Sequence, residues 1–86
     1  MIRFILYSRS YCHLCDDMLD ALKGLIGEQT YPIDVRDVDA DPVLLTLYDE
    51  LVPVLVGVPE NQPPRQLCHY FLNENKVRDF LAGRDR

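Results

Sequence analysis

The sequence predicts an α/β fold, in which a four-stranded mixed sheet has helices on both faces and the elements follow the order β-α-β-α-β-β-α. Two observations lead to this prediction. Apolar or alternating runs of strand length are separated by amphipathic runs with helical spacing. The alternating strands and helices at the start are typical of parallel strands joined by crossovers, whereas the last two strands follow each other across a turn and predict an antiparallel hairpin.

The chain is small and acidic. Its 86 residues, 48% of them apolar, are enough for one core, so residues 1–86 are expected to form a single domain. The 14 acidic and 9 basic residues give a net charge of −5, which argues against nucleic acids and anionic membranes as partners. No stretch approaches the roughly 20 apolar residues of a membrane span. A monomer is expected.

The first two elements are a buried strand and an amphipathic helix. Residues 2–7 are apolar except for Arg3, as in a strand covered on both faces. Ser10 is the expected N-cap of the helix over residues 14–26, and Gly27 is its expected end. The apolar stripe of this helix is assigned to the core and consists of Leu14, Met18, Leu22, Leu25 and Ile26.

An edge strand and a second helix follow. Residues 31–38 alternate between apolar and polar, and Pro32 predicts a position near the edge of the sheet. Asp41 is the expected N-cap of the next helix, with Pro42 at its first position. The acidic residues before it are interpreted as a solvated connection, with a metal site as the alternative. The apolar side of the helix is expected to consist of Leu44, Leu45, Leu47, Tyr48 and Leu51.

The last part of the chain predicts a hairpin and a helix. Residues 51–58 are strongly apolar, residues 59–64 form a proline-rich turn, and residues 65–72 are expected to be the returning strand. Asn73 is the expected N-cap of the final helix. Its apolar positions have i, i+3, i+4 spacing and are Val77, Phe80 and Leu81.

Two cysteines lie between the first strand and the first helix. Cys12 and Cys15 are three positions apart, and residues with this spacing meet on one side of a helical turn. At a helix start, N–H groups without partners and the helix dipole stabilise a thiolate, which is the nucleophile of disulfide exchange. Cys12 is therefore the candidate attacking thiol, and Cys15 is the candidate resolving thiol. The neighbouring Asp16 and Asp17 act against thiolate formation.

Cysteine usage also bears on the compartment. The first residues lack the apolar region and cleavage site of a secretory signal, and three cysteines do not form a secreted disulfide framework. A cytoplasmic location is therefore expected. In that compartment a C-x-x-C motif is more often catalytic or metal-binding than structural.

The order of these motifs resembles the glutaredoxin branch of the thioredoxin superfamily, and within it the short bacterial glutaredoxin-like proteins. Those proteins begin with a strand and L-Y-S-R-x-x-C-x-L-C, followed by D-x-D-x-D-P and V-P-V-L. The corresponding stretches here are residues 6–15, 37–42 and 52–55. The resemblance implies a thioredoxin-like fold and thiol–disulfide oxidoreductase activity.

The resemblance also implies roles for individual residues. Pro53 takes the place of a cis proline that faces the dithiol, and Val52 before it would offer backbone hydrogen bonds to an extended thiol substrate. Arg9 takes the place of a cation that can assist a thiolate and a substrate carboxylate. Tyr11 and His13, on either side of Cys12, complete the candidate substrate-binding residues.

The implied partner is a disulfide-containing protein or glutathione, with no bound cofactor. Two features of the chain depart from glutaredoxins. His13 and Leu14 stand between the cysteines in place of Pro-Tyr, and residues 72–75 lack the Gly-Gly turn that holds glutathione. Glutathione therefore remains only a candidate co-substrate.

Two other classes of function use the same cysteines. One is a non-catalytic interaction module with the same fold. The other is a metal-binding protein, either a zinc protein in which Cys68 and His69 would join Cys12, His13 and Cys15, or a protein with a bridged iron–sulfur cluster held by the two site cysteines. Zinc needs four converging ligands, whereas adjacent residues of a strand point to opposite faces. The default interpretation of Cys68 is a small apolar core residue.

Overall fold

The computed structural model describes residues 2–27 and 31–83, so the predicted domain of residues 1–86 includes seven positions outside the described part. The elements alternate as predicted, apart from a short 3-10 turn, η1, between the second strand and the second helix. In chain order they are β1 (Arg3–Ser8), α1 (His13–Ile26), β2 (Ile33–Asp37), η1 (Val38–Ala40), α2 (Pro42–Tyr48), β3 (Val54–Val58), β4 (Arg65–His69) and α3 (Glu74–Leu81).

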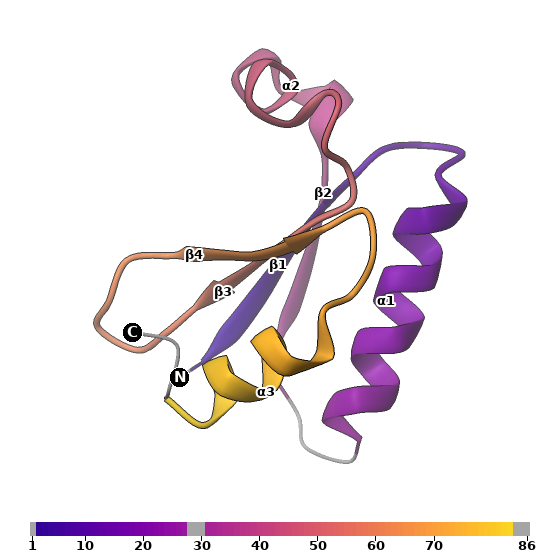
Figure 1. Cartoon of the computed structure of the whole chain (residues 1–86). Coiled ribbons are helices and arrows are strands. Elements are labelled where there is room, and N and C mark those ends of the chain that lie inside the picture. The colour runs from indigo at the N-terminus through magenta and orange to yellow at the C-terminus, as the bar shows by residue number, and fades with distance from the viewer. Residues whose placement is uncertain (1, 28–30, 84–86) are drawn as a thin grey trace.

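The four strands form one mixed sheet in the order β2-β1-β3-β4 (Figure 1). β1 is parallel to β2 and antiparallel to β3, and β3 is antiparallel to β4. The predicted fold class is therefore confirmed, and the strand after Pro32 lies at an edge as expected. Within the described residues, no helix combines the length and apolar character needed to cross a membrane.

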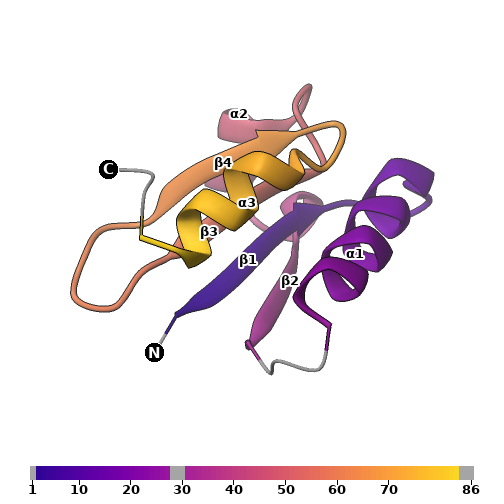
Figure 2. The same ribbon diagram turned by 60° about the horizontal axis from the view of Figure 1, so that its bottom comes forward.

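Helices cover both faces of this sheet. Figure 2 shows α1 and α3 on one face, with α2 beyond the other. Successive side chains of β1 point to opposite faces, so this one strand contributes to both apolar clusters. On the side of α1 and α3 the buried residues are Phe4, Leu6, Met18, Leu22, Leu55, Leu67, Val77 and Phe80. On the side of η1 and α2 they are Ile5, Tyr7, Val38, Val54 and Val56.

Two of the three predicted N-caps of the α-helices are confirmed. The side chain of Asp41 accepts a hydrogen bond from Val43 N–H, with Pro42 in the first turn, and the side chain of Asn73 accepts one from Lys76 N–H. The prediction for α1 was wrong, because Cys12 and not Ser10 is the N-cap. α1 therefore begins two residues later than a Ser10 cap would require.

The hairpin strands are shorter than predicted at the end nearest α2. β3 begins at Val54 because Pro53, with no N–H, cannot donate to the ladder. β4 ends at His69 because Tyr70 adopts a left-handed φ of 64°, which leaves the extended region.

Two apolar positions assigned to helix faces are exposed. Leu14 is 39% exposed because it lies in the first turn of α1, and Leu47 of α2 is 56% exposed. Val35, an apolar position of the alternating strand, is 50% exposed because β2 is an edge strand.

Gly57 gives a test of this packing. A Cβ added to Gly57 in β3 would lie 2.6 Å from Cζ of Phe80, so a Gly57→Ala variant must displace the ring that α3 packs onto the sheet. We expect a loss of about 1–3 kcal/mol in the free energy of unfolding, measured by urea denaturation.

Gly24→Ala is the matched control. Gly24 lies inside α1 and has no atom within 4 Å of an added Cβ. Alanine should raise the stability there by up to about 1 kcal/mol because of its helix propensity. A Gly57→Ala variant as stable as the wild type would contradict the contact with Phe80.

Candidate dithiol site

The register of the sheet gathers the candidate site at one end. Near the last residue of β1, Tyr7 is paired with Val54, the first residue of β3, and Val54 is paired with His69, the last residue of β4. On the other side, Ser8 is paired with Asp37 at the end of β2. The loop before α1, the segment before β3 and the segment after β4 therefore all leave the sheet at the same end.

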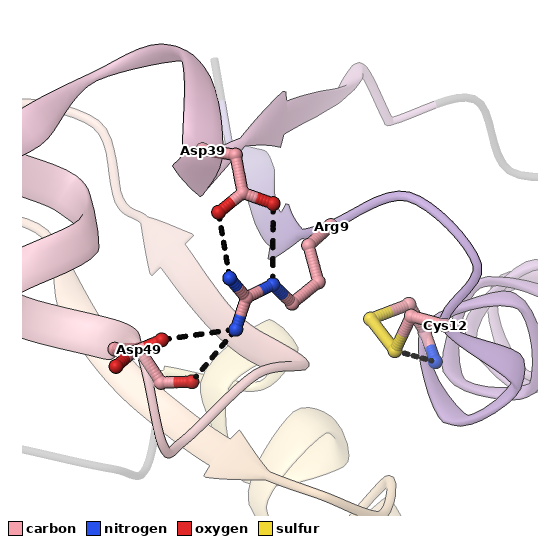
Figure 3. The surroundings of a disulfide bond; sticks show 5 residues. Arg9, Cys12, Asp39 and Asp49 are labelled. Carbon is pink, nitrogen blue, oxygen red and sulfur yellow. Dashed lines mark hydrogen bonds and ion pairs between the residues drawn. A yellow bond between two sulfur atoms is a disulfide. The ribbon is translucent and has the colours of Figure 1, made fainter.

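Cys12 and Cys15 form a disulfide at the start of α1 (Figure 3). Cys12 is in the extended conformation of an N-cap, with φ −107° and ψ 101°, and Cys15 lies one turn into the helix. The two Cα atoms are 5.2 Å apart, within the range that a disulfide can bridge. The predicted spacing of the two sulfurs is thus present in the fold.

The helix start supplies hydrogen bonds to Cys12. The N–H of Cys15 donates to Sγ of Cys12 at 3.1 Å, and the N–H of Asp16 donates to the carbonyl oxygen of Cys12 at 3.2 Å. A sulfur that accepts an amide hydrogen bond at the positive end of a helix dipole is stabilised as a thiolate.

The two sulfurs differ in their exposure to solvent. Residue Cys12 is half-buried, whereas residue Cys15 is only 4% exposed. A substrate can therefore reach Cys12 more easily than Cys15. Asp16 and Asp17, which oppose thiolate formation, are both exposed, and solvent weakens their effect.

Arg9 is engaged with two carboxylates. Its Nε and one terminal nitrogen donate to the two oxygens of Asp39 at 3.2 and 2.6 Å, and its other terminal nitrogen donates to Oδ1 and the carbonyl oxygen of Asp49 at 2.9 and 3.3 Å. The hydrogen bond with Asp39, followed by that with Asp49, raises the pKa of Arg9. Figure 3 shows the guanidinium turned towards these residues and away from the disulfide.

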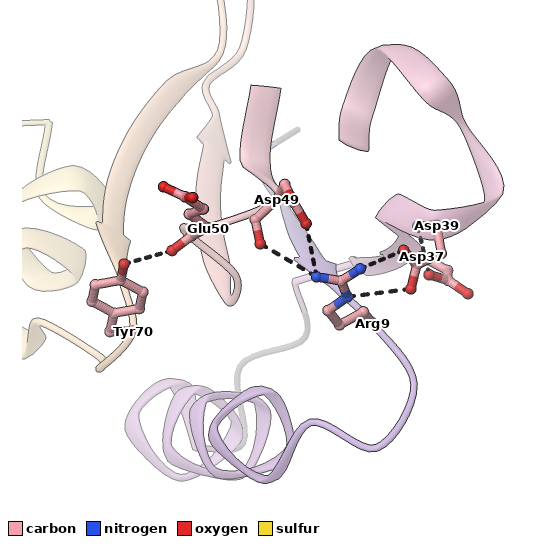
Figure 4. A network of polar contacts seen from close by, with 6 residues as sticks. All are labelled: Arg9, Asp37, Asp39, Asp49, Glu50 and Tyr70. Atoms are coloured by element: carbon pink, nitrogen blue, oxygen red, sulfur yellow. Dashed lines mark hydrogen bonds and ion pairs between the residues drawn. The ribbon is translucent and has the colours of Figure 1, made fainter. Parts of the chain in front are cut away.

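This geometry gives Arg9 a structural connection that the sequence did not suggest. Its fork joins the loop before α1 to η1 and to the end of α2 (Figure 4). Asp39 and Asp49 are 30 and 40 positions away in the chain. A part of the acidic run that was interpreted as a solvated connection therefore binds Arg9. The assistance of Arg9 to the thiolate or to a substrate stays a prediction.

Tyr11 and His13 flank Cys12 at the surface. Tyr11 is fully exposed and has a left-handed φ of 59°, a conformation that is uncommon for a bulky residue. His13 is the first residue of α1 and is exposed. Their predicted contacts with a substrate stay predictions.

The segment before β3 is held by β4. The Val52–Pro53 peptide bond is cis, Pro53 is buried and Val52 is half-buried. The N–H of Tyr70 donates to the carbonyl oxygen of Pro53 at 2.9 Å, and the Tyr70 hydroxyl donates to the carbonyl oxygen of Glu50 (Figure 4). Sequence reasoning missed the role of Tyr70, which it placed inside the expected strand over residues 65–72.

Cys68 is separate from the dithiol and carries a free thiol. It is half-buried and packs against the apolar cluster under α1 and α3, and burial raises the pKa of its thiol. Among residues 2–27 and 31–83, no group of three or more His, Cys, Asp or Glu side chains is placed to hold a metal ion. The zinc alternative therefore has no ligand cluster in the described part of the chain.

The fold and the C-x-x-C pair at the start of α1 define a protein of the thioredoxin superfamily. The sequence matches the Glutaredoxin-like domain (DUF836) over residues 3–82, and the chain belongs to this family. No curated protein matches the chain in sequence.

Solved structures agree with this assignment. Protein Ne2328 from Nitrosomonas europaea is 33% identical, with a TM-score of 0.80 over 92% of this chain and 89% of that one. Protein XcR50 from X. campestris is 25% identical, with a TM-score of 0.64 over 93% and 96%. Fasciola hepatica thioredoxin, 18% identical, shares the fold with a TM-score of 0.61 over 98% of this chain and 81% of that one.

Alkylation should rank the three thiols of the reduced protein. We expect iodoacetamide near neutral pH to modify Cys12 first, because it is the more accessible sulfur and accepts an N–H hydrogen bond. Cys68 should react more slowly than a free cysteine because burial raises its pKa and keeps it protonated, and this difference should narrow as the pH is raised. Peptide mapping over a time course measures this, and earlier labelling of Cys15 would contradict the site.

The planar guanidinium of Arg9 should contribute to stability through its paired hydrogen bonds as well as through its charge. We expect the thermal midpoint to fall in the order wild type, Arg9→Lys, Arg9→Ala, because lysine cannot donate to both oxygens of Asp39 in parallel. High salt should reduce the loss, since these groups are partly exposed.

The control for Arg9 is Arg36→Ala. In the described part of the chain, Arg36 bonds to the nearby Asp34 of its own strand, so its removal breaks no long-range side-chain bond there. Equal losses for Arg9→Ala and Arg36→Ala would show that the connection to Asp39 and Asp49 contributes nothing.

Proposed function

We propose that the protein is a thiol–disulfide oxidoreductase, in which Cys12 attacks and Cys15 resolves. One observation carries this proposal. The more exposed sulfur of the pair, Cys12, accepts the Cys15 N–H at a helix start, while its partner is buried one turn further in. Fold and cysteine pair together fit a redox role.

The reaction would proceed by two exchanges. The Cys12 thiolate attacks one sulfur of a substrate disulfide, so that a Cys12–substrate bond forms, and the other substrate sulfur leaves as a thiolate that takes up a proton. Cys15 then gives up its proton and attacks Sγ of Cys12. The Cys12–Cys15 disulfide forms, and the second substrate thiol is released. Two electrons pass from the protein to the substrate, and of the two protons that the substrate thiols take up, one comes from Cys15 and one from solvent.

Solvent access supports this order of events. The first attack needs a sulfur that a bulky substrate can reach, and Cys12 is the more exposed of the two. The second attack needs a thiol that is held close to Cys12 and shielded from other disulfides. Cys15 is buried, and its Cα atom lies 5.2 Å from that of Cys12.

The surroundings suggest how a substrate would be oriented. Val52 and Pro53 lie at the same end of the sheet as Cys12, so the backbone of Val52 is our candidate for pairing with an extended substrate segment. Tyr11 and His13 are exposed beside Cys12 and are candidates for contacts with it. Arg9 is proposed to act mainly through the segment that begins at Asp49, which leads to Val52.

We place this activity in the cytoplasm, acting as a monomer on a disulfide-containing protein, with glutathione as a candidate co-substrate. The supporting observations are the small number of cysteines and the acidic net charge of −5. Nucleic acids and membranes are not among the proposed partners.

Two serine variants test the roles. Cys15→Ser should form a mixed disulfide with a test disulfide and then stall, since no thiol remains to release it. Cys12→Ser should form none, because Cys15 is buried. Non-reducing gels and intact-mass spectrometry distinguish the two, and Cys68→Ser, which leaves both site cysteines in place, is the control. Turnover by Cys12→Ser would reject the assigned roles, and an unreactive wild type would favour a non-catalytic module.

A further inference from the structure

A groove begins beside the dithiol and runs along α1. Its volume is about 250 Å³, and it lies between α1 and the connection from β4 to α3, which are neighbours in Figure 1. Its lining residues come from these two segments and the first residue of α3, and they are Leu14, Asp17, Met18, Ala21, Tyr70, Phe71, Leu72 and Glu74.

The groove is connected to the candidate site at both walls. On one wall, Leu14 lies in the first turn of α1, between the two cysteines. On the other wall, Tyr70 bonds through its N–H to Pro53 and through its hydroxyl to Glu50. A chain segment seated in the groove would therefore lie against the helix turn that carries Cys15 and against Tyr70, which bonds to Pro53.

Three large apolar side chains of this groove are exposed. Leu14 is 39% exposed, Tyr70 40% and Phe71 69%. Tyr70 also has a left-handed φ of 64°, which glycine would adopt more readily. Exposed apolar side chains gathered along a groove are typical of an interaction site.

The charged groups of the groove are acidic. They are Asp17 and Glu74, and the latter is paired at 3.4 Å with Arg78 on the next turn of α3. No basic residue in the described part of the chain lines the groove. Arg9 is bound by two carboxylates, and Lys76 lines a different hollow, beside Cys68. Glutathione disulfide carries four carboxylates and two ammonium groups, so this surface should disfavour it.

We propose that the groove docks the stretch of a substrate protein that flanks its disulfide, and that this stretch is apolar with a lysine or arginine that lies against Asp17 and Glu74. The inference rests on the proposed oxidoreductase function and names its substrate class. The apolar walls supply the contact area, and the acidic pair selects the sign of the charge.

The test measures single-turnover rates of the pre-reduced protein with three disulfides. Two are symmetric peptide dimers with identical apolar residues around one cysteine, flanked by lysine in one and glutamate in the other, and the third is glutathione disulfide. We expect the lysine peptide to react about tenfold faster than the glutamate peptide at low salt, and this ratio should shrink at high salt. Acid quenching and mass spectrometry follow the reaction.

Matched variants distinguish the effect of a charge in the groove from the effect of the net charge of the protein. Asp17→Lys should reduce the preference for the lysine peptide, whereas Asp34→Lys, which changes the charge equally on the edge strand β2, should not. Phe71→Ser should slow the reaction with both peptides but not the reaction with glutathione disulfide. Val43→Ser, at a similarly exposed position of α2, should not slow the reaction with either peptide. Circular dichroism verifies that each variant is folded.

The outcomes distinguish the two levels of the proposal. If none of the three disulfides oxidises Cys12 and Cys15, the oxidoreductase function fails, and the docking proposal fails with it. If the protein reacts but both peptides have equal rates, or if Asp34→Lys acts as strongly as Asp17→Lys, only the docking proposal is overturned.

Discussion

The burial of β1 on both faces is the constraint on which the rest of the structure depends. This strand pairs with β2 on one side and β3 on the other, and its alternate side chains enter both apolar clusters. Its register with β3 brings Val54 next to Tyr7, and β4 then brings His69 to Val54. Cys12, Pro53 and Tyr70 therefore follow the sheet at one end because a buried strand has no freedom to slip by a residue.

Electrostatics at this end of the sheet are arranged to hold the loops. Arg9 could serve a thiolate in principle, but its guanidinium donates to Asp39 and Asp49. These bonds fix the loop that carries Cys12 relative to the segment that leads into Pro53. The stabilisation of a Cys12 thiolate then comes chiefly from the backbone, through the Cys15 N–H and the dipole of α1. Backbone donors are held by the helix itself and need no free cation.

Local signals in the sequence predicted the fold well, and long-range contacts account for what they missed. Asp41 and Asn73 were predicted as N-caps because a cap depends only on a residue and the next turn. The cap of α1 was misassigned because serine has a higher cap preference than cysteine, whereas the disulfide turn places Cys12 there. The contacts of Arg9 span 30 and 40 residues, and the bond of Tyr70 to Pro53 joins two strand ends, so no local pattern could have indicated them.

Two tyrosines beside the dithiol are not explained by folding alone. Tyr11 and Tyr70 both have left-handed φ angles, which cost of the order of 1–3 kcal/mol for such residues and which glycine would adopt without that cost. The hydroxyl of Tyr70 offsets part of this through Glu50. The ring of Tyr11 is fully exposed, so packing within the described part of the chain does not offset its cost. The proposed contact of Tyr11 with a substrate would give this conformation a functional reason, and the apolar groove that includes Leu14 lies along the helix that begins after the same cysteine.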